Sequence, residues 1–245
     1  VDLETGDVVG AEALLRWQHP ERGLLSPGTF LWQLAGTELE IELGEWVVHT
    51  ALAQLTHWKH SFTGLPADFC ISVNLSGHQL LKPGFFGWMQ GVLLRYPGVG
   101  PGELELEILE SAALADMATA ASVMADCRAI GVRFALDDFG TGYSSLAYFR
   151  TLPVDVIKID QSFVRDMLQD ADDHGIVQSV VYLAHAFHRP VIAEGVETLA
   201  HASALLRLGC HLAQGYGVGR PMPATAWPDW LGKWQQSKAW ETLRA

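Results

Sequence analysis

Short apolar runs alternate along the chain with longer stretches that repeat apolar residues at helical spacing. Seven runs have the length and composition of strands: 8–15, 69–75, 104–109, 132–137, 154–159, 190–193 and 211–214. Helical stretches cover 39–58, 112–130, 175–188 and 198–208. Gly131 and Gly209 follow two of them, as glycine often does after the last turn of a helix. The alternation predicts right-handed strand–helix–strand units and a parallel sheet.

Six of the strand-like runs end in a polar side chain that is able to bind a metal ion or a phosphate. The side chains are Glu12, Asn74, Glu107, Asp137 with Asp138, Lys158 and Glu194. Active sites of parallel β-barrels lie at the carboxyl ends of the strands, so this set indicates an enzyme, and specifically a metal-dependent one.

The length of 245 residues fits a single α/β domain with a TIM-like (β/α)8 barrel, which typically needs about 250 residues. No long linker or low-complexity segment divides the chain, so we expect one domain over 1–245. The pattern supplies seven strands rather than eight. Residues 1–7 resemble the end of a hairpin whose first strand is missing or incomplete, which suggests a fragment of a larger protein.

Composition and charge restrict the possible partners. Hydrophobic residues make up 49% of the chain and charged residues 18%, which allows a large core and argues against disorder. The net charge of −12 argues against a nucleic-acid polymer as partner, although a small phosphorylated ligand remains compatible if bound cations reverse the local field. With no signal peptide and no apolar stretch of roughly 18 residues, we expect no membrane insertion.

The cysteine pattern indicates a location. Cys70, Cys127 and Cys210 lie far apart and form no CxxC motif, which is typical of buried thiols in a reducing cytosol. We therefore expect a cytoplasmic protein, or the cytoplasmic domain of a membrane-anchored one.

The sharpest local signal is Asp137-Asp138-Phe139-Gly140-Thr141-Gly142. Two adjacent carboxylates suit a bridging position between two divalent cations, and the glycines give a loop that approaches a ligand closely. An aspartate helix cap before a glycine turn is an equally good interpretation of the pair alone.

The other strand-end oxygens extend this metal hypothesis. Glu12, Asn74 and Glu107 suit Mg²⁺ or Mn²⁺ better than zinc. Taken singly, however, Glu12 is more readily interpreted as a surface charge and Asn74 as a turn former. Glu194 and Gln214 follow the last two runs, where they are placed to hold a metal, its water or a ligand base.

Three further features leave alternatives open. Lys158 lies among apolar residues, so it needs an anionic partner or a shifted pKa, unless it faces water on an edge strand. The histidines show no HxxxH or HExxH signature and are expected to be scattered surface or core residues. Tryptophan and leucine at 227, 230, 231 and 234 predict a closing helix packed on the barrel rather than an aromatic ligand cage.

In their order along the chain, these motifs resemble the EAL-domain family of cyclic di-GMP phosphodiesterases. The motifs are Glu12-Ala13-Leu14, Ser72-Val73-Asn74-Leu75-Ser76, Glu107-Ile108-Leu109-Glu110, Asp137-Asp138-Phe139-Gly140-Thr141-Gly142, Lys158-Ile159-Asp160, Glu194-Gly195-Val196-Glu197 and Gln214-Gly215-Tyr216. The resemblance implies a TIM-like barrel whose first strand runs antiparallel to the rest. It also implies hydrolysis of cyclic di-GMP to linear pGpG with two Mg²⁺ or Mn²⁺ ions.

The resemblance also implies a role for each site residue. Glu12, Asn74, Glu107 and Asp137 would bind one metal, and Asp137, Asp138 and Glu194 the second. Lys158 would act on the attacking water or on phosphoryl charge, next to the catalytic carboxylates Glu12 and Glu194. Arg16 and Gln214 would contact substrate, with Glu197 in support. Glu110 would anchor the loop that contains Gly140, Thr141 and Gly142, a loop implicated in metal binding and in a homodimer.

Other functions fit the same motifs. A non-catalytic cyclic di-GMP receptor would share the fold, but degenerate members lose ligands or the glycine-rich loop, and here those positions are intact. A barrel hydrolase for another phosphodiester would share the metal site. The resemblance also suggests regulatory domains in the same polypeptide. A departure from the family pattern is the glycine-rich segment 215–221.

Overall fold

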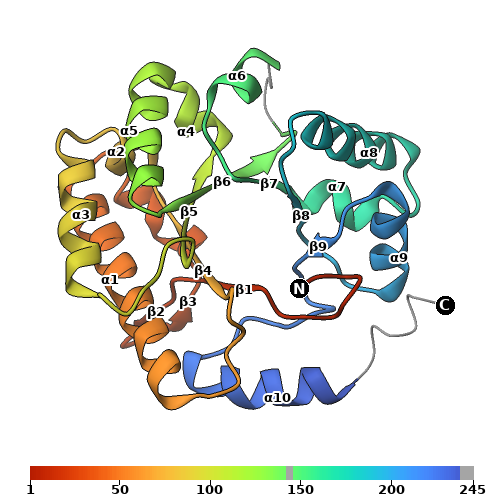
Figure 1. Ribbon diagram of the computed structural model, residues 1–245, viewed down its shortest axis with the longest axis horizontal. Helices are drawn as coiled ribbons and strands as arrows, with labels where there is room; N and C mark the ends of the chain where they lie inside the picture. The colour runs from red at the N-terminus through yellow and green to blue at the C-terminus, as the bar shows by residue number, and fades with distance from the viewer. Residues whose placement is uncertain (142–145, 238–245) are drawn as a thin grey trace.

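The computed structural model describes residues 1–141 and 146–237 of the chain. Seven strands form one sheet in chain order, with every neighbouring pair parallel. They are β1 (Gly10–Ala13), β4 (Cys70–Asn74), β5 (Leu104–Leu109), β6 (Arg133–Phe139), β7 (Val156–Ile159), β8 (Val191–Ala193) and β9 (Leu212–Ala213). The sheet curls around a central axis (Figure 1), so the predicted α/β, TIM-like barrel is confirmed.

Helices surround the curled sheet, most of them on its outside (Figure 1). They are α1 (Glu38–Ser61), α2 (Gly77–Leu80), α3 (Phe85–Arg95), α4 (Glu110–Leu114), α5 (Met117–Ala129), α6 (Leu146–Thr151), α7 (Gln161–Asp166), α8 (Ala171–Ala186), α9 (Leu199–Leu208) and α10 (Trp227–Ser237). Three short 3-10 turns occupy Pro27–Thr29, Leu31–Gln33 and Ala224–Ala226.

The predicted helix over 112–130 is wrong as a single element. The side chain of Asp116 accepts a hydrogen bond from the Thr119 backbone N–H, which caps a new helix. The stretch is therefore divided into α4 and α5, because a capping aspartate offers the backbone an alternative partner to continued helix.

The sheet separates apolar from polar side chains by alternation. On β5, Leu104, Leu106 and Ile108 join the hydrophobic core, whereas Glu105 and Glu107 point to the opposite side of the strand. A hydrophobic outer face lets the helices pack on the sheet. The polar side chains are left to line the interior of the barrel.

The first residues of the chain close the gap beside the last strand. Asp2 forms an antiparallel bridge with Leu212, and the Leu3 backbone N–H donates to the His211 carbonyl over 2.7 Å. The Asp2 N–H donates to the Asp7 carbonyl over 2.8 Å, which makes 2–7 the predicted hairpin end. A short antiparallel segment thus lies against β9.

The carboxyl-terminal tryptophans build the predicted closing helix. Trp227 of α10 stacks on Trp58 of α1 with ring centroids 4.6 Å apart, and Leu231 of the same helix is buried. The Trp234 indole N–H donates to the Gly6 carbonyl over 2.8 Å. These contacts hold α10 against α1 and the amino-terminal hairpin.

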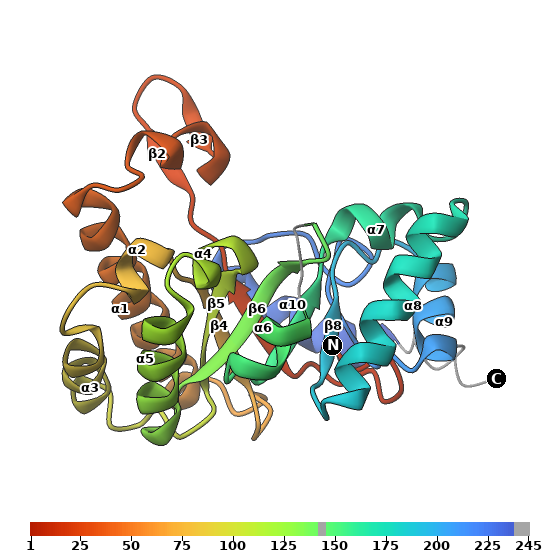
Figure 2. The ribbon, with the colours of Figure 1, turned by 90° about the horizontal axis from the view of Figure 1, so that it is seen from above.

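Viewed from above (Figure 2), a small antiparallel hairpin projects from the face of the barrel that carries the carboxyl ends of the strands. Its strands are β2 (Trp17–His19) and β3 (Gly23–Leu25), directly after β1.

Two expectations about the chain as a whole can be compared with the structure. Cys70, Cys127 and Cys210 are buried free thiols, as predicted. In the described ranges, no helix combines the length and the apolar character that a bilayer crossing requires.

Candidate active site

Polar side chains from the first and last strands of the sheet meet at the carboxyl-end face. The Glu12 carboxylate accepts one hydrogen bond from the Asn74 amide over 2.7 Å and another from the Gln214 amide over 2.9 Å. Gln214 also donates to Glu194 over 3.0 Å. Because Glu12 belongs to β1 and Gln214 follows β9, these bonds close the ring of strands around the site.

Lys158 lies at the centre of the predicted residues. Its side chain is 1% exposed, and its Nζ lies 2.6 Å from Glu194, 2.8 Å from Glu107, 3.3 Å from Asp137 and 3.8 Å from Glu12. β7 lies between β6 and β8, so the edge-strand interpretation is wrong.

The sequence left open whether Lys158 has anionic partners or a shifted pKa, and the structure provides the partners. Burial by itself lowers the pKa of the Lys158 ammonium, but the surrounding carboxylates, led by Glu107, raise this pKa well above its ordinary value. The buried lysine is therefore charged.

One ammonium does not neutralise this many carboxylates. Burial, only partly opposed by Lys158, raises the pKa of Glu194 to about 7. Burial together with Asp137 and Asp160 raises the pKa of Asp138 to about 6. Burial likewise raises the pKa of Glu107 well above its ordinary value. Glu12 differs: burial acts to raise its pKa, but Lys158, Gln214 and Asn74 together bring it below the ordinary value.

These shifts predict a pH dependence of cation binding. Protons on Glu194 and Asp138, whose pKa values are about 7 and about 6, must leave before a cation binds, so affinity for Mn²⁺ should increase as the pH rises from about 5 to about 8. We expect about a tenfold change per pH unit for each displaced proton. Calorimetric Mn²⁺ titrations in two buffers of different ionisation heat would measure both the affinity and the protons released. An affinity independent of pH would contradict the prediction.

The same raised pKa values also determine how the free energy of unfolding of the metal-free protein depends on pH. The folded state holds these protons more tightly than the unfolded state, since the ordinary values are 3.8 for Asp138 and 4.5 for Glu194. Their contribution to the free energy of unfolding of the metal-free protein is full below about pH 4 and is lost as the pH rises through about 7.

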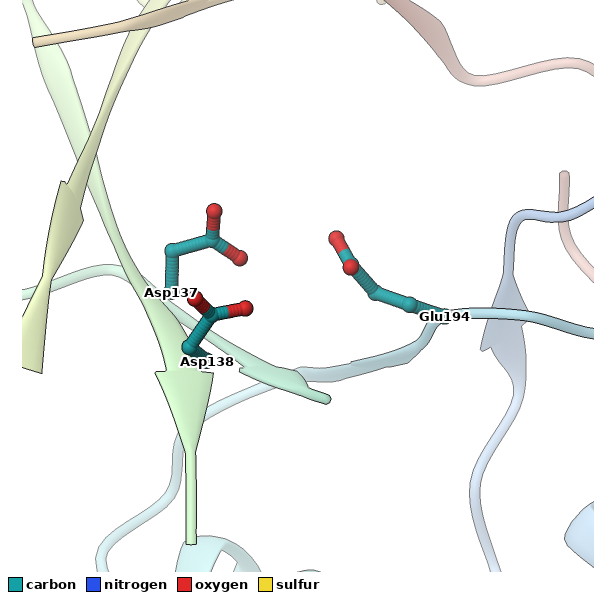
Figure 3. Close-up of side chains that lie close together, drawn as sticks. All are labelled: Asp137, Asp138 and Glu194. Atoms are coloured by element: carbon teal, nitrogen blue, oxygen red, sulfur yellow. The ribbon is translucent and has the colours of Figure 1, made fainter. Parts of the chain in front are cut away.

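The donor set fits hard divalent cations. One carboxylate oxygen each of Asp137, Asp138 and Glu194 lies within 4.8 Å of the other two, and the three side chains face one another (Figure 3). Glu107 Oε2 and Asp137 Oδ1 are buried and lie 2.8 Å and 3.3 Å from the Lys158 ammonium. Carboxylate oxygens gathered at one place are the donors that Mg²⁺ and Mn²⁺ prefer.

An irregularity in β6 brings the two consecutive aspartates to the same side. Neighbouring residues of a regular strand point to opposite faces. Here the register with β7 shifts between Leu136 and Phe139, and Asp138 has a left-handed φ of 54°. This bulge directs both Asp137 and Asp138 towards Glu194 (Figure 3). The geometry therefore favours the paired-carboxylate interpretation over a helix cap.

The glycine-rich loop begins directly at this bulge. Gly140 has a φ of 101°, and the Thr141 hydroxyl donates to the Asp138 carbonyl over 2.9 Å. Glu110, the predicted anchor of the loop, is buried in the first turn of α4. Gly142 lies outside the described residues.

Two predicted site residues are not joined to the cluster by the described contacts. Arg16 donates to the Leu15 carbonyl over 2.7 Å. Glu197 is exposed on the segment after β8, where its backbone carbonyl lies against Gly217.

Sequence reasoning assigned no role to two carboxylates at the site. Asp160 caps α7 by accepting a hydrogen bond from Ser162, and it lies close enough to Asp138 to raise the pKa of that carboxyl group. Its position two residues after Lys158 was a usable signal. Glu105, 3% exposed, accepts from the Ser72 hydroxyl and lies 3.4 Å from Arg133. The alternation of β5 places it below Glu107, inside the barrel.

Comparison with known protein sequences identifies relatives along most of the chain. The model of the EAL domain family matches residues 1–221. The bifunctional diguanylate cyclase/cyclic di-GMP phosphodiesterase MucR of Pseudomonas aeruginosa is 42% identical over 219 residues, which cover 89% of this chain and 31% of MucR. A cyclic di-GMP phosphodiesterase of the same species is 37% identical over 231 residues, covering 94% of this chain and 38% of that protein. The chain thus spans about a third of the length of these relatives.

Solved structures show the same fold. A PaMucR phosphodiesterase in complex with c-di-GMP has a TM-score of 0.84 and 41% identity, covering 90% of this chain and 88% of the other. The EAL enzyme Bd1971, bound to cAMP and cyclic-di-GMP, has a TM-score of 0.88 and 32% identity, covering 94% of this chain and 62% of the other.

Proposed function

This chain belongs to the EAL domain family, and from that premise we propose that it hydrolyses cyclic di-GMP to linear pGpG with two divalent cations. The observation that supports this most directly is the cluster of carboxylates and amides around Lys158 at the carboxyl-end face. The names of the relatives, which include cyclic di-GMP phosphodiesterases, support the same substrate.

In this proposal, two sets of side chains hold the cations. Glu12, Asn74, Glu107 and Asp137 would bind the first, and Asp137, Asp138 and Glu194 the second, with Asp137 shared. Two cations held there would supply activation of a water molecule and neutralisation of the phosphoryl oxygens of the diester. Mg²⁺ and Mn²⁺ both suit the all-oxygen donor set.

The remaining residues position these groups. Gln214 donates to both Glu12 and Glu194, so it fixes a carboxylate of each proposed set relative to the other. The Lys158 ammonium, in contact with Glu107 and Glu194, is placed to orient the attacking water or to stabilise charge on the phosphoryl group. We assign Arg16 to a substrate phosphate, Glu110 to the glycine-rich loop and Glu197 to support of the loop after β8.

The wider setting is also proposed from the relatives. Because the chain spans about a third of each curated relative described above, we propose that regulatory domains belong to the same polypeptide. A cytoplasmic location and a homodimer complete the proposal.

Turnover in the presence and absence of metal tests the function. Purified protein incubated with cyclic di-GMP should release pGpG with Mg²⁺ or Mn²⁺, and chelator should abolish this, because the carboxylates alone repel the phosphates. Chromatography of the nucleotides measures the product. Glu42→Ala, at an exposed position of α1, is the control variant and should match the wild type. Intact nucleotide that co-elutes with metal-loaded protein would reject hydrolysis in favour of a receptor.

A further inference from the structure

The turn after β9 carries an exposed aromatic ring with a guanidinium resting on it. The Cζ atom of Arg220 lies 4.5 Å from the centroid of the Tyr216 ring, and Tyr216 is 55% exposed. Tyr216 is two residues from Gln214, which donates to Glu12 and Glu194. The turn that carries the pair therefore begins at a residue bonded to the carboxylate cluster, and none of the roles assigned above uses the pair.

Backbone hydrogen bonds hold this turn close to the cluster. The Gly219 N–H donates to the Gly215 carbonyl over 3.0 Å. The backbone just before Arg220 therefore lies next to the backbone just after Gln214. The Gly217 N–H donates to the Val196 carbonyl over 2.9 Å, which ties the turn to the segment that follows Glu194.

Glycine is required at two positions of the turn by close backbone contacts. A Cβ on Gly215, whose φ is 153°, would lie 2.3 Å from the Val196 nitrogen. A Cβ on Gly217 would lie 2.6 Å from the Glu197 carbonyl oxygen. Gly215 and Gly217 thus allow the turn to pack closely against the segment after β8, and these contacts fix the path of the backbone that leads to Arg220.

Apart from its contact with the Tyr216 ring, the Arg220 guanidinium has no charged partner among the described residues. Among the residues that the structure describes, no carboxylate lies within ion-pair distance of Arg220, whereas Arg165, which follows β7, pairs with Asp166 at 3.3 Å. In a chain of net charge −12, an arginine at the rim of an acidic site without a carboxylate partner is placed to meet an electron-rich group of the ligand.

We infer that Arg220, supported by Tyr216, recognises a guanine base of the substrate through the O6 and N7 atoms of that base. An arginine resting on an aromatic face keeps its forked N–H edge exposed, and that edge matches the two acceptors of guanine. Adenine presents an amino donor in place of O6 and would oppose the same contact. This inference rests on the proposed function, which places the phosphates at the cluster and so leaves the bases to extend towards its rim.

Arg220→Ala should lower kcat/KM for cyclic di-GMP by about 10- to 100-fold. Arg220→Lys should recover little of this loss, because a lysine lacks the fork. Tyr216→Phe, which keeps the ring, should match the wild type, and Tyr216→Ala should lose part of the effect. Hydrolysis of bis(p-nitrophenyl) phosphate, a diester without bases, should be unchanged in every variant. Arg95→Ala, at an exposed arginine at the end of α3, is the matched control.

The experiment separates this inference from the proposed function. Turnover of cyclic di-GMP by Arg220→Ala at the rate of Arg95→Ala would overturn the inference alone. The inference would also be overturned if Arg220→Ala lost as much turnover of bis(p-nitrophenyl) phosphate as of cyclic di-GMP. The same holds if its residual turnover of cyclic di-AMP fell by the same factor, because neither substrate contains guanine. If the wild type binds a fluorescent cyclic di-GMP without hydrolysing it, and Arg220→Ala weakens that binding, the inference holds and the phosphodiesterase proposal fails.

Discussion

Replacing Lys158 by methionine should lower the free energy of unfolding of the metal-free protein by about 3–5 kcal/mol near neutral pH. The Lys158 ammonium is 1% exposed and is within 4 Å of carboxylates from four strand ends. Methionine fills a similar volume but leaves those carboxylates facing one another without a cation. Removing one partner of a buried ion pair is costly because the other partner cannot return to water.

Chemical denaturation in chelator would measure this loss. Lys82→Met is the matched control, because Lys82 is 41% exposed and its pair with Glu38 at 3.2 Å is a surface ion pair worth about 1 kcal/mol or less. Mn²⁺ should restore part of the stability of Lys158→Met, since a divalent cation replaces the missing positive charge. The loss should be smaller near pH 5, where the carboxylates with raised pKa values are protonated.

The same variant separates the two proposed contributions of Lys158. With saturating Mn²⁺ the protein should be folded and loaded, yet turnover should fall by about 10²–10³-fold, the usual loss when a charge that stabilises a transition state is removed. Equal stability of Lys158→Met and wild type in chelator would show that the ammonium does not neutralise the cluster. Unchanged turnover would remove Lys158 from the chemistry.

Glu12→Ala should weaken Mn²⁺ binding by about 100-fold or more. This loss exceeds the one expected when a residue that only hydrogen-bonds to a metal ligand is replaced. Glu12 is a proposed ligand, and it also accepts hydrogen bonds from Asn74 over 2.7 Å and from Gln214 over 2.9 Å. Without its carboxylate, both amides lose the group that orients them. Turnover at low Mn²⁺ should therefore be abolished, and high Mn²⁺ should restore part of it.

Calorimetric titration with Mn²⁺, together with turnover as a function of Mn²⁺ concentration, would measure both effects. Glu42→Ala removes an exposed carboxylate of α1 and should change neither affinity nor turnover. Wild-type Mn²⁺ affinity in a Glu12→Ala protein that has lost turnover would contradict the proposed ligand role and leave Glu12 a different part in the reaction.

The convergence of polar strand ends was predictable because each signal is local. Glu12, Glu107 and Glu194 each follow an apolar run, and parallel strands bring their carboxyl ends to one face. The environment of Lys158 was not predictable from its neighbours in sequence, because a central and an edge strand have similar local composition.

Elements that bury little surface escaped prediction. The β2–β3 hairpin exposes Trp17 by 44% and Leu24 by 65%, so its sequence has no alternation of buried and exposed positions that would reveal a strand. The division between α4 and α5 depends on one side-chain cap, at Asp116, which an alanine-rich pattern conceals.

The roles of Arg16 and Glu197 rest on resemblance, since no described contact joins either residue to the cluster.

Because of the bulge in β6, the proposed second cation site depends on the number of residues in that strand as well as on their identity. Asp138 faces Glu194 because the strand holds one position more than its regular pairing with β7 would use. Deleting a single residue there would return the strand to strict alternation and rotate one aspartate out of the barrel, with both aspartates still present in the sequence. Among related chains, this site can therefore be lost through a one-residue gap in an alignment even where both aspartates are retained.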